Sequence, residues 1–139
     1  MKINKLLWNN KLHSLTFISA IIGIAVFFSG TKDICSEVNK SIMLGDAQQL
    51  SKYLCSMVEM SVLGKEGYFS KVQAVSILSE FFKNNPPKDF TVKKGGSTSE
   101  NTKFSIGTYT TSGGIFKIYY VVKKEQENEF VYKLTIEKK

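Results

Sequence analysis

Residues 70–87 read SKVQAVSILSEFFKNNPP, and they determine how the rest of the chain can be interpreted. Ser70 and Gln73 form the capping-box pattern that begins a helix, and apolar residues follow at helical spacing. These residues are Ala74, Val75, Leu78, Phe81 and Phe82. The helix must end at Asn84-Asn85-Pro86-Pro87, because proline disfavours a helical residue before it and supplies no amide donor. The stretch therefore predicts one amphipathic helix.

The sequence before this helix predicts two shorter helices and one strand. A helix over residues 33–44 carries an apolar stripe and is expected to end at Gly45. Asp46 is a suitable N-cap for a second helix over residues 47–54. Residues 57–63 then alternate with a period of two, which predicts a strand closed by glycines.

Four further runs after the helix predict antiparallel strands. They cover residues 89–94, 103–111, 115–124 and 129–137. The segments between them are rich in turn-forming residues, namely Gly95-Gly96 with a polar loop, Ser112-Gly113-Gly114 and Gln126-Glu127-Asn128. The third of these strands is apolar on both faces, so we expect it to be central and covered on both sides. The fold class predicted is therefore α+β, with helix, helix, strand, helix and then a bent antiparallel sheet of four further strands.

The length and composition allow a single globular domain. The chain has 139 residues, of which 42% are hydrophobic and 22% are charged. These values are ordinary for a globular protein, so disorder and a multi-span membrane protein are disfavoured. We expect residues 1–30 to be a targeting segment and residues 31–139 to form one α+β cone domain.

The first 30 residues follow the plan of a secretory signal peptide. Lys2, Lys5 and Lys11 precede an apolar stretch from Leu12 to Phe28, and small residues follow it. Bulky Phe28 makes the cleavage site imperfect, so an uncleaved N-terminal anchor is the alternative. Either outcome places the domain outside the cytoplasm, in the periplasm or the extracellular space, with a possible tether to the inner membrane. Contact with a membrane is expected only through this segment if it is not cleaved.

The charge pattern disfavours nucleic-acid binding. From residue 31 onward the chain has 16 lysines and 12 carboxylates, and it has no arginine. The lysines are dispersed, so they form no surface that could follow a phosphate backbone. The bidentate fork of arginine, which recognises base edges and phosphates, is also missing.

The residue types present limit the chemistry of the domain. His13 is the only histidine and lies in the N-terminal segment, so no histidine-based triad or histidine-ligated metal site can form in the mature chain. The acidic residues Glu125, Glu127 and Glu129 flank a turn without the spacing of a calcium loop. We therefore expect no metal site and no cofactor.

The two cysteines allow two interpretations. Cys35 and Cys55 lie ten residues before and after Gly45, the expected turn of a helical hairpin. Residues equidistant from such a turn can face each other, so a disulfide is geometrically possible outside the cytoplasm. The alternative is two buried free thiols that pack as small apolar residues. A redox-catalytic role is disfavoured, because the chain has no CxxC spacing.

The order of elements resembles the nuclear-transport-factor-2-like fold, also called ketosteroid-isomerase-like or cystatin-like. The amino-acid sequence is similar to those of a family of small exported bacterial domains of unknown function. The residues that carry this resemblance are Asp46 to Tyr53, Val58 to Met60, Tyr68 to Ala74, Phe81 to Pro87 and Ile106 to Tyr109. The resemblance implies a bent sheet wrapped around helices, with a cone whose wide end can hold a small apolar ligand. It implies no activity, because this fold supports isomerases, binding modules and dimerisation platforms alike.

Three functional hypotheses follow. The first is a non-catalytic module that binds a small apolar ligand or a protein partner through the cone pocket or the exposed sheet face. The second is an isomerase or lyase in which Glu59, buried among apolar residues, acts as general base with a tyrosine as oxyanion donor. The third is a structural homodimer packed through the sheet. The candidate pocket tyrosines are Tyr53, Tyr109, Tyr120 and Tyr132. Dispersed charge and the missing histidine favour the first hypothesis.

Overall fold

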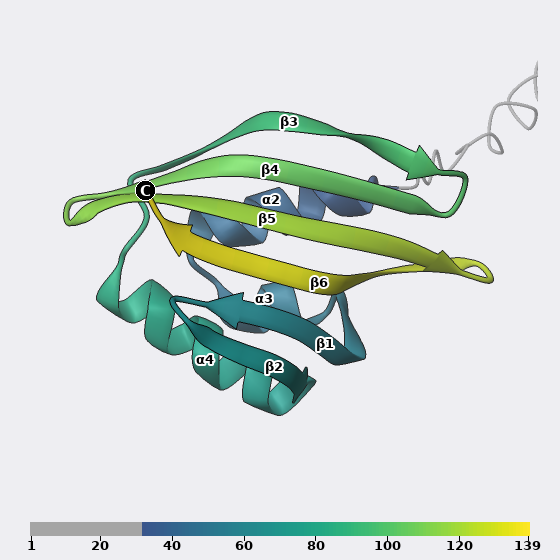
Figure 1. The fold of residues 1–139 in the computed structure, drawn as a ribbon, viewed down its shortest axis with the longest axis horizontal. Helices are drawn as coiled ribbons and strands as arrows, with labels where there is room; N and C mark the ends of the chain where they lie inside the picture. The colour runs from purple at the N-terminus through teal and green to yellow at the C-terminus, as the bar shows by residue number, and fades with distance from the viewer. Residues whose placement is uncertain (1–31) are drawn as a thin grey trace, which may run out of the picture. The chain divides into compact units, whose positions relative to one another are not determined.

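The structure is a computed structural model, and it describes residues 32–139 (Figure 1). Its helices are α2 (Ile34–Leu44), α3 (Ala47–Ser51) and α4 (Lys71–Asn84). Its strands are β1 (Leu54–Val62), β2 (Lys65–Ser70), β3 (Asp89–Ser99), β4 (Thr102–Thr111), β5 (Gly114–Glu125) and β6 (Asn128–Lys138). The predicted α+β class and the order of helices are confirmed. The predicted targeting segment lies outside the described residues.

Each helix begins and ends at residues whose chemistry favours a terminus. Asp33 and Asp46 are the N-caps of α2 and α3, and each carboxylate accepts a hydrogen bond from a backbone amide in the first turn. Gly45 ends α2 in the left-handed conformation, with φ of 63°. The predicted capping box of α4 is present, because the side chains of Ser70 and Gln73 each accept from the backbone amide of the other.

The six strands form one sheet in the order β2-β1-β6-β5-β4-β3. Strands β3 to β6 form an antiparallel meander, and β1 and β2 form a separate hairpin. The two parts join through β1 and β6, which pair in parallel, with Leu54 opposite Val131 and Met60 opposite Leu134. The first and last strands of the domain are therefore neighbours near the middle of the sheet.

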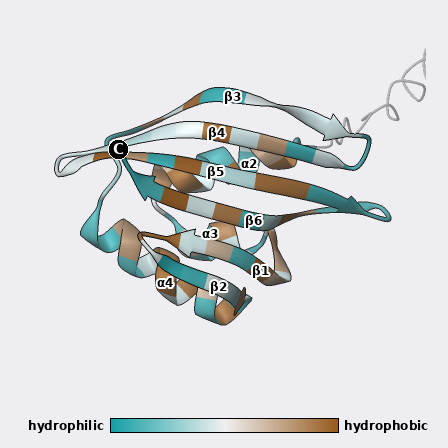
Figure 2. Ribbon diagram, in the orientation of Figure 1, coloured by the Kyte–Doolittle hydropathy of each residue, from teal (hydrophilic) through white to brown (hydrophobic). Residues whose placement is uncertain are grey.

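The helices pack against one face of the sheet, which we call the inner face, and the other is the open face (Figure 1). Apolar and polar residues alternate along β6, as the banding in Figure 2 shows, whereas β5 is apolar over most of its length. The inner face of β5 carries Phe116, Ile118, Tyr120 and Val122, all buried. These residues pack with apolar residues of the helices, including Val38, Ile42, Leu50, Leu78 and Phe81. The main core thus lies between the helices and the inner face.

Helix α3 and strand β1 differ from the sequence prediction. The second helix was expected to reach Leu54, but it ends at Ser51, and the strand begins at Leu54 instead of Met57. The physical reason is that this segment pairs with β6, because the Val131 amide donates to the Tyr53 carbonyl at 2.8 Å. A parallel partner from the far end of the chain therefore outweighs the local helical pattern.

Strands β2 and β3 also differ from the prediction. The glycines at 64 and 67 were interpreted as the end of a strand, but residues 65–70 form β2 and pair with β1. Strand β3 was expected to end at Lys94, yet it continues through Gly95 and Gly96, which pair with Ser105 and Phe104. Both are edge strands with largely exposed side chains, so they lack the alternating apolar pattern that identifies a half-buried strand.

Strand β5 is interior, as predicted, but helices cover it on one face only (Figure 1). On the open face Val121 is nevertheless buried, whereas Ile115 near the start of the strand is exposed. Among the described residues, 32–139, no helix has both the length and the apolar character needed to cross a membrane.

Candidate functional site

A cavity of about 280 Å³ lies between the first turns of α2 and the strands β3 and β4. We call it the mouth cavity. The residues that determine its chemistry are Asp33, Cys35, Asn39, Val92, Lys103 and Ser105. The backbone of Gly95 and Gly96 forms part of its wall. This volume lies just below the range of about 300–1,000 Å³ that is usual for small-molecule sites.

Local structure explains why these side chains meet. Cys35 and Asn39 are four residues apart in α2, so they lie one above the other on one side of the helix. Ser105 shares the inner face of β4 with Tyr109, because side chains two residues apart in a strand point the same way. Its antiparallel partner in β3 is Gly95, which has no side chain to place beside Ser105.

Ser105 is the unusual residue of the mouth cavity. Its side chain is only 3% exposed. Among the buried side-chain oxygen and nitrogen atoms of residues 32–139, its Oγ alone has no hydrogen-bond partner. Buried polar groups are nearly always hydrogen-bonded, and an unpartnered hydroxyl costs about 1–3 kcal/mol. The fold therefore tolerates an unfavourable group at the floor of this cavity.

A hydrogen-bonded group next to Ser105 fixes the orientation of Asn39. The Tyr120 hydroxyl donates to Asn39 Oδ1 at 2.7 Å and also lies 3.2 Å from the Cys35 carbonyl oxygen. Burial raises the pKa of Tyr120. The Ser105 hydroxyl is near enough to the phenol to oppose part of this rise, but the two groups do not reach the geometry of a hydrogen bond. The Tyr120 hydroxyl donates to Asn39, so Asn39 keeps both Nδ2 donors and one lone pair of Oδ1 for a further partner.

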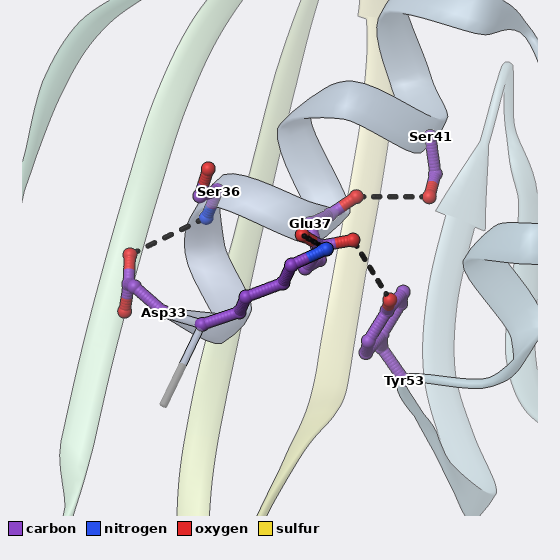
Figure 3. A network of polar contacts seen from close by, with 6 residues as sticks. Asp33, Ser36, Glu37, Ser41 and Tyr53 are labelled. Carbon is purple, nitrogen blue, oxygen red and sulfur yellow. Dashed lines mark hydrogen bonds and ion pairs between the residues drawn. The ribbon is translucent and has the colours of Figure 1, made fainter. Parts of the chain in front are cut away.

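The rim of the mouth cavity is charged but internally paired. Lys103 Nζ lies 2.8 Å from Glu129 Oε1 and 3.5 Å from Asp33 Oδ1. The hydrogen bond that Lys103 donates to the Glu129 carboxylate raises the pKa of Lys103, so its ammonium group stays charged at neutral pH. One cation thus lies between two carboxylates. Asp33 has a further role, because it also caps α2 through the Ser36 amide (Figure 3).

The cavity thiol is held in its protonated form. Burial raises the pKa of Cys35, and the adjacent Asp33 carboxylate raises it further. A thiol with a raised pKa is a weak hydrogen-bond donor and a poor nucleophile at neutral pH. The arrangement is therefore suited to hydrogen bonding more than to covalent chemistry.

The four candidate tyrosines do not converge on one site. The Tyr109 hydroxyl donates to the Asn85 carbonyl at 2.6 Å, and its ring packs 5.5 Å from that of Phe81. The Tyr53 hydroxyl donates to Glu37 Oε2 at 3.2 Å, as Figure 3 shows.

The other two tyrosines also lie apart from each other. Tyr132 lies beneath Lys123, whose Nζ is 4.0 Å from the ring centroid. Tyr120 does not line the mouth cavity, but its hydroxyl donates to Asn39 and lies near the Cys35 carbonyl, and both of these residues do.

Glu59, the candidate general base, lies on the open face and not in the helix-covered interior. Its Oε1 is 2.9 Å from Lys133 Nζ, and both side chains are 37% exposed. The hydrogen bond that Lys133 donates to Glu59 raises the pKa of Lys133. This pair lines a second cavity, of about 490 Å³, together with Glu66, Tyr68 and Glu137. The catalytic hypothesis required Glu59 inside the cone, and the structure places it elsewhere.

Both cysteines are free thiols in the structure. The disulfide hypothesis placed Cys55 on the second arm of a helical hairpin, but Cys55 lies in β1. Its thiol donates to the Met57 carbonyl, and burial raises its pKa. The two thiols have different surroundings, because Cys35 borders the mouth cavity. Within residues 32–139, no cluster of three or more metal-ligating side chains is present.

Sequence reasoning missed Ser105, Asn39 and Lys103. The sequence could have indicated that Ser105 is buried. It is four residues before Tyr109 in the same strand, so both side chains lie on the apolar inner face. Asn39 likewise lies one turn after Cys35 in the first helix. That the two residues lie together could not be predicted, because 66 residues separate them in the chain.

Comparison with known proteins identifies the family and the fold. The family model described as Domain of unknown function (DUF4783) matches residues 35–137. A DUF4783 family protein from Bacteroides uniformis is 25% identical, with a TM-score of 0.73, and 77% of this chain and 98% of that chain are covered. One from Bacteroides ovatus is 29% identical, with a TM-score of 0.71, and the coverage is 75% and 94%.

A more distant crystal structure supports the fold alone. It is an NTF-2 like protein of unknown function from Silicibacter pomeroyi, 8% identical, with a TM-score of 0.57 and coverage of 76% and 89%. No curated protein is significantly similar to the sequence. The chain belongs to the family described as Domain of unknown function (DUF4783), and its fold is the nuclear-transport-factor-2-like fold that the sequence resembles.

Proposed function

We propose that this protein is a non-catalytic binding module outside the cytoplasm, and that it holds a small ligand in the mouth cavity. The observation that carries the proposal is the buried, unpartnered Ser105 hydroxyl at the cavity floor. An alanine there would avoid the desolvation cost, whereas a ligand that bonds to the hydroxyl would remove it.

The chemistry of the cavity supports binding in preference to catalysis. The Cys35 and Tyr120 pKa values are raised, so both groups stay protonated near neutral pH. The Lys103 ammonium group is held between two carboxylates. A general base or nucleophile needs a deprotonated group that can reach its substrate. None of these three groups meets that requirement.

Native mass spectrometry of the protein purified from its producing cell tests the proposal. We expect the wild-type protein to retain a small molecule or to gain one from a metabolite extract. Ser97→Trp should abolish this binding, because Ser97 lines the exposed rim of the cavity. Its neighbour Thr98 is absent from the cavity lining, so Thr98→Trp is the matched control and should retain binding. Equal binding by both variants would place the ligand elsewhere.

The homodimer hypothesis stays a prediction that concerns the open face. Residues Met57, Tyr68 and Ile115 have large exposed apolar side chains, and the first two belong to that face of the β1–β2 hairpin. Sedimentation equilibrium at micromolar concentration tests this hypothesis separately. A monomer would contradict it and would leave the proposal for the mouth cavity unchanged.

A further inference from the structure

We propose that the mouth cavity selects an uncharged small molecule through a carboxamide group. This inference rests on the proposed function, and it names the ligand class of the same site. It differs from the small apolar ligand that the family resemblance implies.

The floor of the cavity offers two complementary hydrogen-bonding groups. Asn39 offers both of its Nδ2 protons as donors, whereas its Oδ1 already accepts from the Tyr120 hydroxyl at 2.7 Å and keeps a single lone pair. Ser105 is only 3% exposed, and its Oγ has no hydrogen-bond partner. The hydroxyl can therefore both donate to a ligand and accept from one. A carboxamide matches this pair, since its carbonyl oxygen accepts from Asn39 and its N–H donates to Ser105.

A charged ligand fits the cavity less well. The floor groups Ser105, Asn39 and Cys35 are all uncharged at neutral pH, so an ion bound there would be desolvated without a counter-charge. Lys103 on the rim is already engaged by Asp33 and Glu129. An anion would therefore meet two carboxylates beside the lysine, and a cation would have to displace the ammonium group from both.

A wholly apolar ligand is disfavoured by the same floor. It would keep Ser105 Oγ unpartnered and would remove the Asn39 amide from water, and each unsatisfied group costs about 1–3 kcal/mol. The large apolar residues that line the cavity are Val92 and Phe104, and Val92 is 43% exposed. An aliphatic substituent on the carboxamide can therefore pack against Val92 while the polar head group reaches the floor.

A series of compounds with nearly the same carbon skeleton separates these classes. The probes are isobutyramide, isobutyrate, isobutylamine and 3-methyl-2-butanone, which are an amide, an anion, a cation and an acceptor without a donor. Each is titrated into the ¹⁵N-labelled protein purified from its producing cell. The readouts are the backbone amide of Ser105 and the side-chain Nδ2 protons of Asn39.

We expect isobutyramide to shift both resonances saturably and to bind about tenfold more tightly than the other three compounds. Ser105→Ala should weaken isobutyramide binding about tenfold and still fold, because the hydroxyl has no partner within residues 32–139 to lose. Ser61→Ala is the matched control. Its hydroxyl donates to Glu66 at 3.1 Å on the open face, so the titration should not change.

The possible failures of the two proposals are distinguishable. Stronger shifts of Ser105 and Asn39 with the anion, the cation or the ketone would overturn the carboxamide inference and leave the cavity as a binding site. A retained cellular ligand without an amide would do the same. If no probe shifts these resonances and no ligand is retained, both the inference and the proposed function are wrong.

Discussion

At the scale of single residues, Gly107 is the glycine of residues 32–139 that has the least room for a side chain. It lies on the inner face of β4, opposite Val92 in β3, and the ring of Phe90 lies directly over it. A Cβ at this position would overlap two carbon atoms of that ring and approach the Thr91 carbonyl oxygen at 3.2 Å. Glycine is therefore required by packing, since the position has no positive φ that would require it.

Gly107→Ala should lower the free energy of unfolding by about 2 kcal/mol, because Phe90 is buried and cannot move away without strain. Chemical denaturation measures this change. Gly96→Ala is the control, since a Cβ there comes no closer than 3.8 Å to the Phe104 ring. Equal stability of the two variants would contradict the proposed overlap. Phe90→Leu combined with Gly107→Ala should recover part of the loss.

The buried tyrosine Tyr109 should make the protein sensitive to alkali. Burial raises its pKa above the value of about 10 that holds in the unfolded chain. The protonated phenol therefore contributes fully to the free energy of unfolding below about pH 10. As the pH rises above this value, that contribution falls by about 1.4 kcal/mol per pH unit. Tyr120, Cys35 and Lys103 also have raised pKa values, so their deprotonation at high pH also lowers the free energy of unfolding.

The contribution of Tyr109 is isolated by comparing variants. Unfolding free energies from pH 8 to 11.5 should fall less steeply for Tyr109→Phe than for the wild type, although Tyr109→Phe starts lower because it loses its bond to Asn85. Tyr68→Phe, at a side chain that is 70% exposed, should keep the wild-type slope. The prediction is wrong if Tyr109→Phe keeps that slope too.

At the scale of elements, the two-residue turn of the β1–β2 hairpin places a leucine in a backbone conformation that leucine disfavours. Leu63 and Gly64 both have positive φ, of 50° and 86°. A two-residue turn with both central residues in this region favours Asn-Gly or Gly-Gly, because a branched or bulky side chain is strained there. This turn is one reason why the hairpin was not predicted from the sequence.

Leu63→Asn should raise the free energy of unfolding by about 1 kcal/mol, since asparagine tolerates the left-handed conformation. The Leu63 side chain is 52% exposed, so little packing is lost. Thermal and chemical denaturation measure the change. Leu63→Ala is the matched control, because it removes the side chain but keeps the strain. A gain in stability with alanine as large as that with asparagine would show that the strain is not the cause.

The success of the sequence prediction also varied by element. Helix α4 was predicted within one residue of its observed bounds because its caps and apolar stripe are local signals. Strands β4 and β6 were predicted because they alternate between a buried and a wetter face. Strand β5 was predicted because its apolar run is bounded by turn-forming residues. Strand β2 and the second half of β3 were missed because edge strands are held by backbone pairing, which leaves no side-chain pattern.

At the scale of the whole domain, stability should be lowest at the two edges of the sheet. Strand β3 pairs with β4 alone, and its residues after Phe90 are exposed. Strands β5 and β6 are interior and carry much of the buried core. Local opening is favoured where few buried apolar contacts hold the backbone.

Hydrogen exchange should therefore be at least about tenfold faster for the amides of Lys93 to Ser99 than for those of β5. Exchange followed by mass spectrometry or NMR measures the difference. The comparison is made at two protein concentrations. Slow exchange in β3 at both concentrations would contradict this account, whereas protection that increases with concentration would indicate edge pairing between copies.

The sequence by itself determined the helices, the meander, the fold class and the family resemblance, because caps, turns and apolar periodicity are encoded by residues close together in the chain. Only the tertiary structure decided the parallel pairing of β1 with β6, the place of Glu59 on the open face and the meeting of Asn39 with Ser105. The physical reason is that these contacts join distant segments. Register and strand order fix them, and neither is visible in local periodicity.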